Sequence, residues 1–392
     1  MNKTIICETD RDRIAIVVVG YNRIEPVKRL LSSLIKAEYK GENVPLYISL
    51  DCSNDILLYN YVKEYHWPFG NKYINIQEER LGLKKHILQC GDLSEYFRAI
   101  VLLEDDIYVG EYFYEYATKV IDYYKDDERI GGFALYSHEI GAGGLPLAYY
   151  QDGSDTFLRQ DVISWGECWT REQWKKFKEW YNYFTDDDFS RIDMPENAKM
   201  WKESWTKYYA AYLVDTNRYF VIPYNSYTTC FCDAGEHYNM FTMAGQVCLV
   251  AGSRDYIFHP FEKMVRYNIY FVNERIYDWL GFDKSEICVD WYNLKKDSEG
   301  KRYLLSAMKL PFGIIRKYGL YLRPIELNVK YNIDGDGLYV YDISNNHNLN
   351  KATFSLEFAN YCVRSLNCKM LYLYLRSIYC NRIMRKLRKI FR

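Results

Sequence analysis

The first half of the chain repeats one hydrophobic pattern, in which a continuous apolar run is followed by an amphipathic stretch. The run from Ile14 to Val19 is apolar and mostly β-branched, which is typical of a strand buried on both faces of a parallel sheet. Val27, Leu30 and Leu34 follow it at the spacing of one helix face. We therefore expect a helix that packs on this strand.

The same pattern recurs along the chain, with strands predicted at residues 45–50, 73–77 and 100–103 and helices at 55–65 and 83–93. Alternating strands and helices of this length predict an α/β fold with a Rossmann-like, doubly wound, mostly parallel sheet. Beyond residue 255 the apolar runs become short and irregular. We expect a main domain at 1–255, a smaller C-terminal α+β extension at 256–365 and a tail at 366–392.

Polar side chains follow three of the predicted strands at the point where each strand ends. Tyr21 and Arg23 follow the first strand, Asp51 follows the second, and the acidic triplet 104–106 follows the fourth. Ligands of such sheets bind beyond the carboxyl ends of the strands, so we expect these side chains to lie close together. Asp51 could instead cap the next helix, and Arg23 could be an ordinary surface charge.

The triplet Glu104-Asp105-Asp106 predicts a cation site. Adjacent carboxylates at a buried strand end repel one another, which is costly without a positive charge. Strand side chains alternate, so Glu104 and Asp106 share one face. We expect Asp106 to bind Mg²⁺ or Mn²⁺ directly, because these ions prefer oxygen ligands. The alternative is an acidic turn without a metal.

Composition narrows the possible partners. The net charge of −1 gives no argument for nucleic acid. The 11 cysteines are odd in number and show no disulfide framework, which favours reduced thiols in a cytoplasmic protein. Cys230 and Cys232, with His237 nearby, lack the remaining ligands of a zinc site. Neither a signal peptide nor an apolar run of about 18 residues is visible.

The end of the chain combines apolar positions at helical spacing with many Arg and Lys residues, over residues 379–392. A basic amphipathic helix of this kind can lie on an anionic membrane surface. The alternative is a solvated helix that packs on its own domain.

Several short motifs together resemble those of the GT-A glycosyltransferases. The similarity is to bacterial family-2-like enzymes and to the family of N-acetylglucosaminyltransferase I, and it covers roughly residues 14–240. The acidic triplet alone is weakly specific, whereas the ordered set is more so. The motifs are Val17 to Arg23, Ser49 to Ser53, Leu81 to His86, Cys90 to Leu93, Leu103 to Asp106, Ser164 to Thr170 and Asp233 to His237.

The resemblance implies a nucleotide-sugar donor, a UDP-sugar in particular, and a divalent metal. It assigns the metal to Asp106, with His237 as a possible further ligand or phosphate contact. A lone loop histidine is more often structural. The implied donor contacts are Tyr21, Arg23, Asp51 for the uracil, Lys85, His86, Glu104, Asp105 and the ring of Trp165. Trp165 and Trp169 could form a platform for a sugar, although such residues often belong to the core.

The family's acceptor base is a carboxylate just before a tryptophan at the start of a helix. The corresponding stretch here is Trp201-Lys202-Glu203-Ser204-Trp205, so Glu203 is the candidate. The related pattern carries aspartates at this place, and Glu203 could instead complement a helix dipole. The implied reaction is an inverting transfer to a hydroxyl of a glycan or lipid-linked glycan. The implied setting is surface polysaccharide assembly at the inner face of the cytoplasmic membrane.

Two other classes of function use related features. A nucleotidyltransferase could use a similar sheet and acidic site, but it would typically carry a glycine-rich loop after the first strand. The stretch Gly20-Tyr21-Asn22-Arg23 is poor in glycine. A non-catalytic carbohydrate-binding relative would not need the acidic triplet, which is intact.

Overall fold

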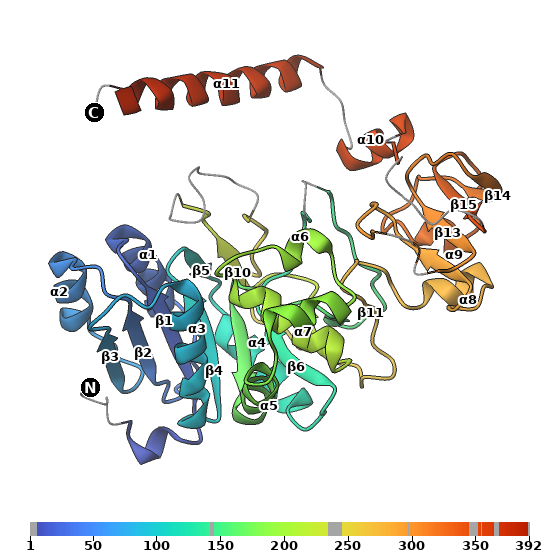
Figure 1. The fold of residues 1–392 in the computed structure, drawn as a ribbon. Helices are drawn as coiled ribbons and strands as arrows, with labels where there is room; N and C mark the ends of the chain where they lie inside the picture. Colours follow the sequence, from blue (N-terminus) through green and yellow to red (C-terminus); the bar gives the residue numbers. More distant parts are fainter. Residues whose placement is uncertain are drawn as a thin grey trace.

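The computed structural model describes residues 6–141, 145–233, 245–296, 298, 300–344, 352–353, 355–363 and 368–390. The chain forms a large α/β unit, a smaller mixed unit and a long C-terminal helix (Figure 1). The description below refers to these residues only.

One large sheet organises the α/β unit. Its order within the described residues is β11-β7-β9-β6-β8-β4-β1-β2-β3. Strands β1 to β4 are parallel, and β8 is antiparallel to both β4 and β6. The predicted α/β fold with a mostly parallel sheet is confirmed. The strands are β1 (Ile14–Gly20), β2 (Leu46–Leu50), β3 (Lys72–Ile76), β4 (Ala99–Glu104), β6 (Ile130–Ala134), β7 (Thr156–Arg159), β8 (Glu167–Thr170), β9 (Tyr219–Pro223) and β11 (Arg266–Tyr267).

Alternation along β1 builds a core on each face of the sheet. Ile16 and Val18 belong to one buried cluster, which includes residues of α1, α2 and α4. Ala15 and Val17 belong to the other, which includes residues of α3, α5 and α7. This two-sided burial explains the continuous apolar run of the strand. The helices are α1 (Ile24–Ile35), α2 (Ile56–Glu64), α3 (Leu83–Gly91), α4 (Phe113–Tyr124), α5 (Arg171–Tyr181), α6 (Glu196–Lys199) and α7 (Trp205–Asp215).

Two elements place the acidic triplet. Glu104 ends β4, and Asp105 and Asp106 form the turn into β5 (Ile107–Val109). β5 pairs with β10 (Thr228–Cys230) in a small antiparallel sheet. The turn is therefore fixed at both ends by strand hydrogen bonds.

The smaller unit contains a four-stranded sheet and short helices. The sheet order is β12-β13-β15-β14, in keeping with an α+β arrangement. Its elements are α8 (Ile276–Leu280), β12 (Ile287–Val289), β13 (Tyr303–Ser306), β14 (Gly313–Tyr318), α9 (Leu327–Lys330), β15 (Leu338–Asp342) and α10 (Leu356–Val363).

The two units share buried side chains. Phe189 and Tyr208 of the α/β unit belong to the same cluster as Val340 of the smaller one. β11 pairs with β7 although it follows residue 255 in sequence. The predicted division at residue 255 stays a prediction.

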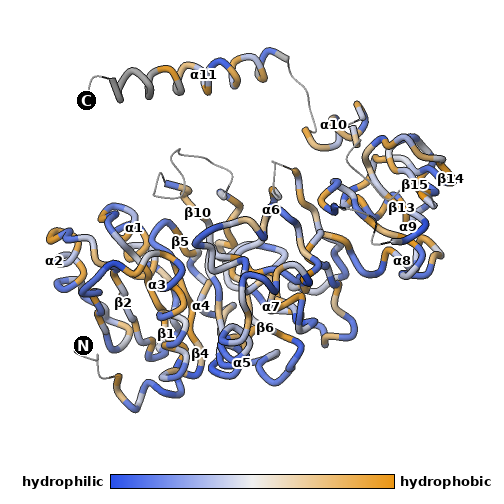
Figure 2. Tube along the Cα trace, viewed as in Figure 1, coloured by the Kyte–Doolittle hydropathy of each residue, from blue (hydrophilic) through white to orange (hydrophobic). Residues whose placement is uncertain are grey.

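The last described element is α11 (Cys368–Ile390), which lies away from the rest of the protein in Figure 1. Figure 2 shows hydrophilic and hydrophobic residues interleaved along its coloured part. Among the described helices, none has the length and hydrophobicity needed to cross a bilayer.

Candidate active site

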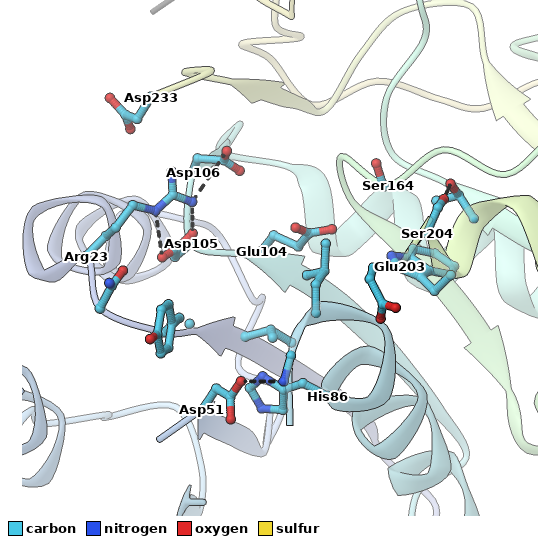
Figure 3. A pocket seen from close by; sticks show the side chains of 18 of the residues that line it. Arg23, Asp51, His86, Glu104, Asp105, Asp106, Ser164, Glu203, Ser204 and Asp233 are labelled. Atoms are coloured by element: carbon cyan, nitrogen blue, oxygen red, sulfur yellow. Dashed lines mark hydrogen bonds and ion pairs between the residues drawn. The ribbon is translucent and has the colours of Figure 1, made fainter. Parts of the chain in front are cut away.

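A cavity of about 660 Å³ opens where β1, β2 and β4 end (Figure 3). The lining residues come from these strand ends, from the start of α3 and from the loop before α7. Among them are Tyr21, Arg23, Asp51, His86, Glu104, Asp105, Asp106, Trp165 and Glu203. Most of the side chains that the sequence singled out therefore lie together, at the carboxyl ends of the parallel strands as expected.

Arg23 lies at the centre of the charge arrangement. Its guanidinium donates to both carboxylate oxygens of Asp105, with 3.2 Å between Nε and Oδ2. It also lies 3.6 Å from Oδ2 of Asp106. Burial raises the pKa of Asp105 to about 6, and Arg23 opposes this rise. One cation thus contacts two carboxylates, the buried Asp105 and the partly buried Asp106.

A second pair of acids, Glu104 and Glu167, lies beside the first. Burial, with the charges of Asp106 and Asp105, raises the pKa of Glu104 to about 8. Glu167, the first residue of β8, is fully buried, and its pKa is well above the usual value because of burial and the nearby Glu104. Both side chains therefore tend to hold a proton near neutral pH. The sequence analysis missed Glu167, since only the pairing of β8 with β4 brings it here.

The acidic end of β4 fits a divalent cation whose coordination shell is completed by a bound ligand. Oδ1 of Asp106 is buried and has no hydrogen-bond partner among the described residues. The described residues contain no group of three or more acidic, His or Cys side chains that could hold a metal ion. Mg²⁺ typically uses one or two carboxylates together with substrate phosphates. Asp106 is suited to that arrangement, and His237 lies outside the described residues.

Asp233 also lines the cavity, at the end of a described segment. Its carboxylate pairs with Arg29 of α1, and the guanidinium of Arg29 stacks 3.8 Å from the ring centroid of Phe231. This pair fixes the chain beyond β10 against α1.

Asp51 organises the loop before α3. Its Oδ1 accepts from the backbone N–H of Leu81 at 2.8 Å, and its Oδ2 accepts from that of Gly82 at 2.9 Å. Gly82 has a φ of +76°, which favours glycine. Asp51 therefore shapes the cavity wall besides lining it, and it does not cap the following helix, which is capped by Asp55.

The two predicted donor contacts on α3 differ in position. His86 lines the cavity and is almost fully buried, with Nε2 at 2.7 Å from Oγ of Ser49. Burial lowers its pKa to about 4, so the imidazole is neutral. Lys85 is exposed and is not among the residues that line the cavity.

An arginine that the sequence analysis missed lies beside Tyr21. The guanidinium of Arg80 stands 4.7 Å from the Tyr21 ring centroid, and both residues line the cavity. Arg80 sits in the loop between β3 and α3, at the carboxyl edge of the sheet. The sequence feature that could have identified Arg80 is its position in a loop that follows a predicted strand.

The two tryptophans that were expected to form a sugar platform lie in different environments. Trp165 lines the cavity and packs edge-on against Tyr136, with 4.8 Å between ring centroids. Trp169 is fully buried among the rings of Trp174, Trp205 and Tyr209. The interpretation of Trp169 as a platform is wrong, because strand alternation in β8 turns its ring into the core.

Glu203 lies across the cavity from Arg23 and the aspartate pair (Figure 3). It is exposed and has a φ of +52°. The neighbouring Ser204 caps α7, since its hydroxyl accepts from the Lys207 backbone N–H at 3.4 Å. The Glu203 carboxylate is therefore not used as the helix cap.

No protein-family model and no curated protein matches this chain. It is similar to the structure of S. aureus TarS 1-349 in complex with UDP-GlcNAc, at 17% identity and a TM-score of 0.39 over 57% of this chain and 60% of that one. It is also similar to a mannosyltransferase from Pyrobaculum calidifontis in complex with GDP-Man and Mn²⁺, at 14% identity and a TM-score of 0.33 over 47% of this chain and 50% of that one. A third similar structure is GalNAc-T7 with UDP, GalNAc and Mn²⁺, at 13% identity and a TM-score of 0.37 over 54% of this chain and 42% of that one. The matched regions thus span 42–60% of these solved chains.

Burial of Glu167 predicts a pH-dependent stability. Its folded pKa is raised, so the folded state keeps a proton that the unfolded state releases above the usual pKa of 4.5. Stability should therefore fall as pH rises from about 4.5 towards the folded pKa. Glu167→Gln, which mimics the protonated acid, should flatten this fall and stabilise the protein at pH 8 by roughly 1–3 kcal/mol.

Chemical denaturation from pH 5 to pH 8.5 in EDTA measures the effect. Glu172→Gln, at an exposed glutamate five positions along the same segment, is the matched control and should follow the wild type. Equal pH slopes for Glu167→Gln and the wild type would contradict the assignment of a buried, protonated side chain.

Proposed function

We propose that this chain is an inverting, metal-dependent glycosyltransferase. It moves a sugar from a nucleotide-diphosphate donor, a UDP-sugar in particular, to a hydroxyl of a glycan or lipid-linked glycan acceptor in surface polysaccharide biosynthesis. One observation carries the proposal: a single cavity has Arg23 and the 104–106 carboxylates on one side and the Glu203 carboxylate on the other.

The β1–β4 side of the cavity suits the donor. The Tyr21 ring and the Arg80 guanidinium offer flat surfaces on which the base of the donor nucleotide can stack. Asp51, at the end of β2, can accept hydrogen bonds from the polar edge of that base. A divalent cation on Asp106 would supply positive charge to the diphosphate leaving group. Arg23 would then turn from the aspartates towards phosphate oxygens, which its planar guanidinium also binds well.

The sugar would lie between the acids and Glu203. Glu104 lines the cavity between them and can hydrogen-bond to a sugar hydroxyl, as a donor when protonated or as an acceptor when ionised. Glu203 takes the proton of the acceptor hydroxyl as that oxygen bonds to the anomeric carbon. The bond to the diphosphate breaks on the opposite face, and the configuration of the carbon inverts.

The nucleotide site predicts metal-dependent binding. UDP should bind in the presence of Mn²⁺, and Asp106→Asn should weaken that binding by about 10- to 100-fold, since it removes the proposed direct ligand. Calorimetric titration with UDP, GDP and dTDP, with and without Mn²⁺, measures this. Asp187→Asn, at an exposed aspartate outside the cavity lining, should bind like the wild type. If no nucleotide binds the wild type, the transferase is rejected in favour of a non-catalytic carbohydrate binder.

The role of Glu203 predicts a loss of turnover without loss of donor binding. Glu203→Gln should lower kcat about 10²- to 10⁴-fold, the usual contribution of a general base, and leave UDP affinity unchanged. Release of UDP from a panel of UDP-sugars, with water as acceptor, measures turnover. Glu196→Gln, at an exposed glutamate before the same loop, should be fully active. Wild-type turnover of Glu203→Gln would show that another group is the base.

The C-terminal helix supports contact with a membrane surface. Tyr372, Tyr374 and Leu375 of α11 are more than 60% exposed, and basic residues are frequent in the same helix. Exposed aromatic and aliphatic side chains beside positive charge suit an anionic lipid surface. These features support the proposal of a cytoplasmic protein that binds peripherally to the membrane.

The tail therefore predicts binding to anionic vesicles. The full chain should sediment with phosphatidylglycerol vesicles at low salt, and much less at about 0.5 M salt because the charges are screened. Phosphatidylcholine vesicles should not bind it. Removal of residues 368–392 should abolish binding to the anionic vesicles and preserve UDP binding. Equal sedimentation of the shortened chain would assign the contact to another surface.

A further inference from the structure

A second cavity, of about 490 Å³, lies next to the smaller unit. Its wall includes residues that directly follow β6 and β9, and others from the region of α9. β6 and β9 run parallel to each other, and β8 is antiparallel to β6 and to β4. The strands β4, β6 and β9 therefore point the same way, and both cavities open along one edge of the sheet.

One pair of rings links the two cavities. Trp165 lines the first cavity and His138 lines the second, with 5.1 Å between their ring centroids. Trp165 is at this edge because β8 runs antiparallel, so the loop that enters β8 lies beside the ends of β4 and β6. The two cavities are therefore neighbours, separated at this point by a pair of rings in contact.

The second cavity has the chemical character of a sugar site. Tyr149, Tyr150, Tyr224 and Tyr331 line it. Tyr331 is 58% exposed, and tyrosine offers a flat apolar face with a polar tip. Polar lining groups such as the exposed amide of Asn225 can bond to hydroxyls.

The charges of the lining favour a neutral ligand. Glu139 and Arg323 have opposite signs, and burial lowers the pKa of His138 to about 3, which keeps it uncharged. The guanidinium of Arg323 donates to the Tyr361 carbonyl and stacks 4.0 Å from the Tyr361 ring centroid, while its Nη1 has no hydrogen-bond partner among the described residues. Its charge is balanced by that of Glu139, so the lining residues carry no net charge, which suits a neutral ligand.

Contacts between the two units hold the wall in place. The Tyr150 hydroxyl accepts from Nζ of Lys330 at 2.5 Å, and its backbone N–H donates to the Tyr267 hydroxyl at 2.7 Å. The Tyr267 hydroxyl in turn donates to Glu326 at 2.5 Å. A wall that is fixed before binding loses little entropy when a ligand arrives.

We propose that this second cavity binds a neutral sugar residue of the acceptor glycan, at a distance from the residue that accepts the new sugar. The proposal rests on the proposed glycosyltransferase function. The smaller unit would then serve to complete the acceptor site, with Tyr331 as the exposed stacking ring. The site would select acceptors that extend beyond a single sugar.

Variants of Tyr331 test the site. The probes are neutral oligosaccharides of increasing length, built from glucose, galactose and N-acetylhexosamines, titrated by saturation-transfer NMR in the presence of UDP and Mn²⁺. Tyr331→Ala should weaken binding of the longer members about tenfold, as expected for loss of a stacking side chain at a binding site. Tyr331→Phe keeps the ring and should bind like the wild type. Tyr321→Ala, at a 74% exposed tyrosine outside the cavity lining, is the matched control.

The outcomes separate this proposal from the proposed function. Oligosaccharide binding that depends on the Tyr331 ring, with unchanged UDP affinity in all variants, supports the second site. Wild-type affinity of Tyr331→Ala, or no saturable binding of any oligosaccharide by the wild type, overturns it even if UDP binds. Ring-dependent oligosaccharide binding without any nucleotide binding would keep the site and reject the transferase.

Discussion

The concentration of negative charge at the end of β4 is the constraint on which the site depends. Glu104, Asp105 and Asp106 meet at a partly enclosed edge, where charges interact more strongly than in water. The parallel register of β1 and β4, with Val19 opposite Glu104, brings Arg23 beside them. Two features respond to this crowding: Glu104 has a raised pKa, and Arg23 pairs with Asp105. In addition, Oδ1 of Asp106 has no hydrogen-bond partner among the described residues. A cation with an anionic ligand would relieve all of it at once.

Local patterns predicted the strands, their order of appearance and the polar residues at their ends. These features depend on periodicity and on the rule that parallel strands present their carboxyl ends together. Asp51, Arg23 and the acidic triplet could be named for that reason. The precise bonds of Asp51 could not, because they reach across to the loop at Leu81 and Gly82.

Features that depend on distant pairing could not be predicted in this way. Glu167 becomes a partner of Glu104 only because β8 inserts, antiparallel, between β4 and β6. The same strand turns Trp169 into the core and leaves Trp165 at the edge, a distinction that aromatic spacing alone does not contain. Lys85 and His86 are neighbours in sequence, yet the helix turns only His86 inward. In each case the neighbouring element decides the direction of the side chain.

The insertion of β8 also relates the two cavities. The proposed inverting transfer needs the acceptor oxygen and the leaving group on opposite faces of one carbon, so the two proposed substrates would approach from different directions. Here the β1–β4 ends carry the charged groups proposed to face a diphosphate, and the cavity beside the β6 and β9 ends is lined by the tyrosines proposed to face a neutral glycan. The loop that enters β8 lies between them, with Trp165 facing one side and its ring partner His138 the other. One antiparallel strand in an otherwise parallel region thus divides a single sheet edge into a charged half and an aromatic half.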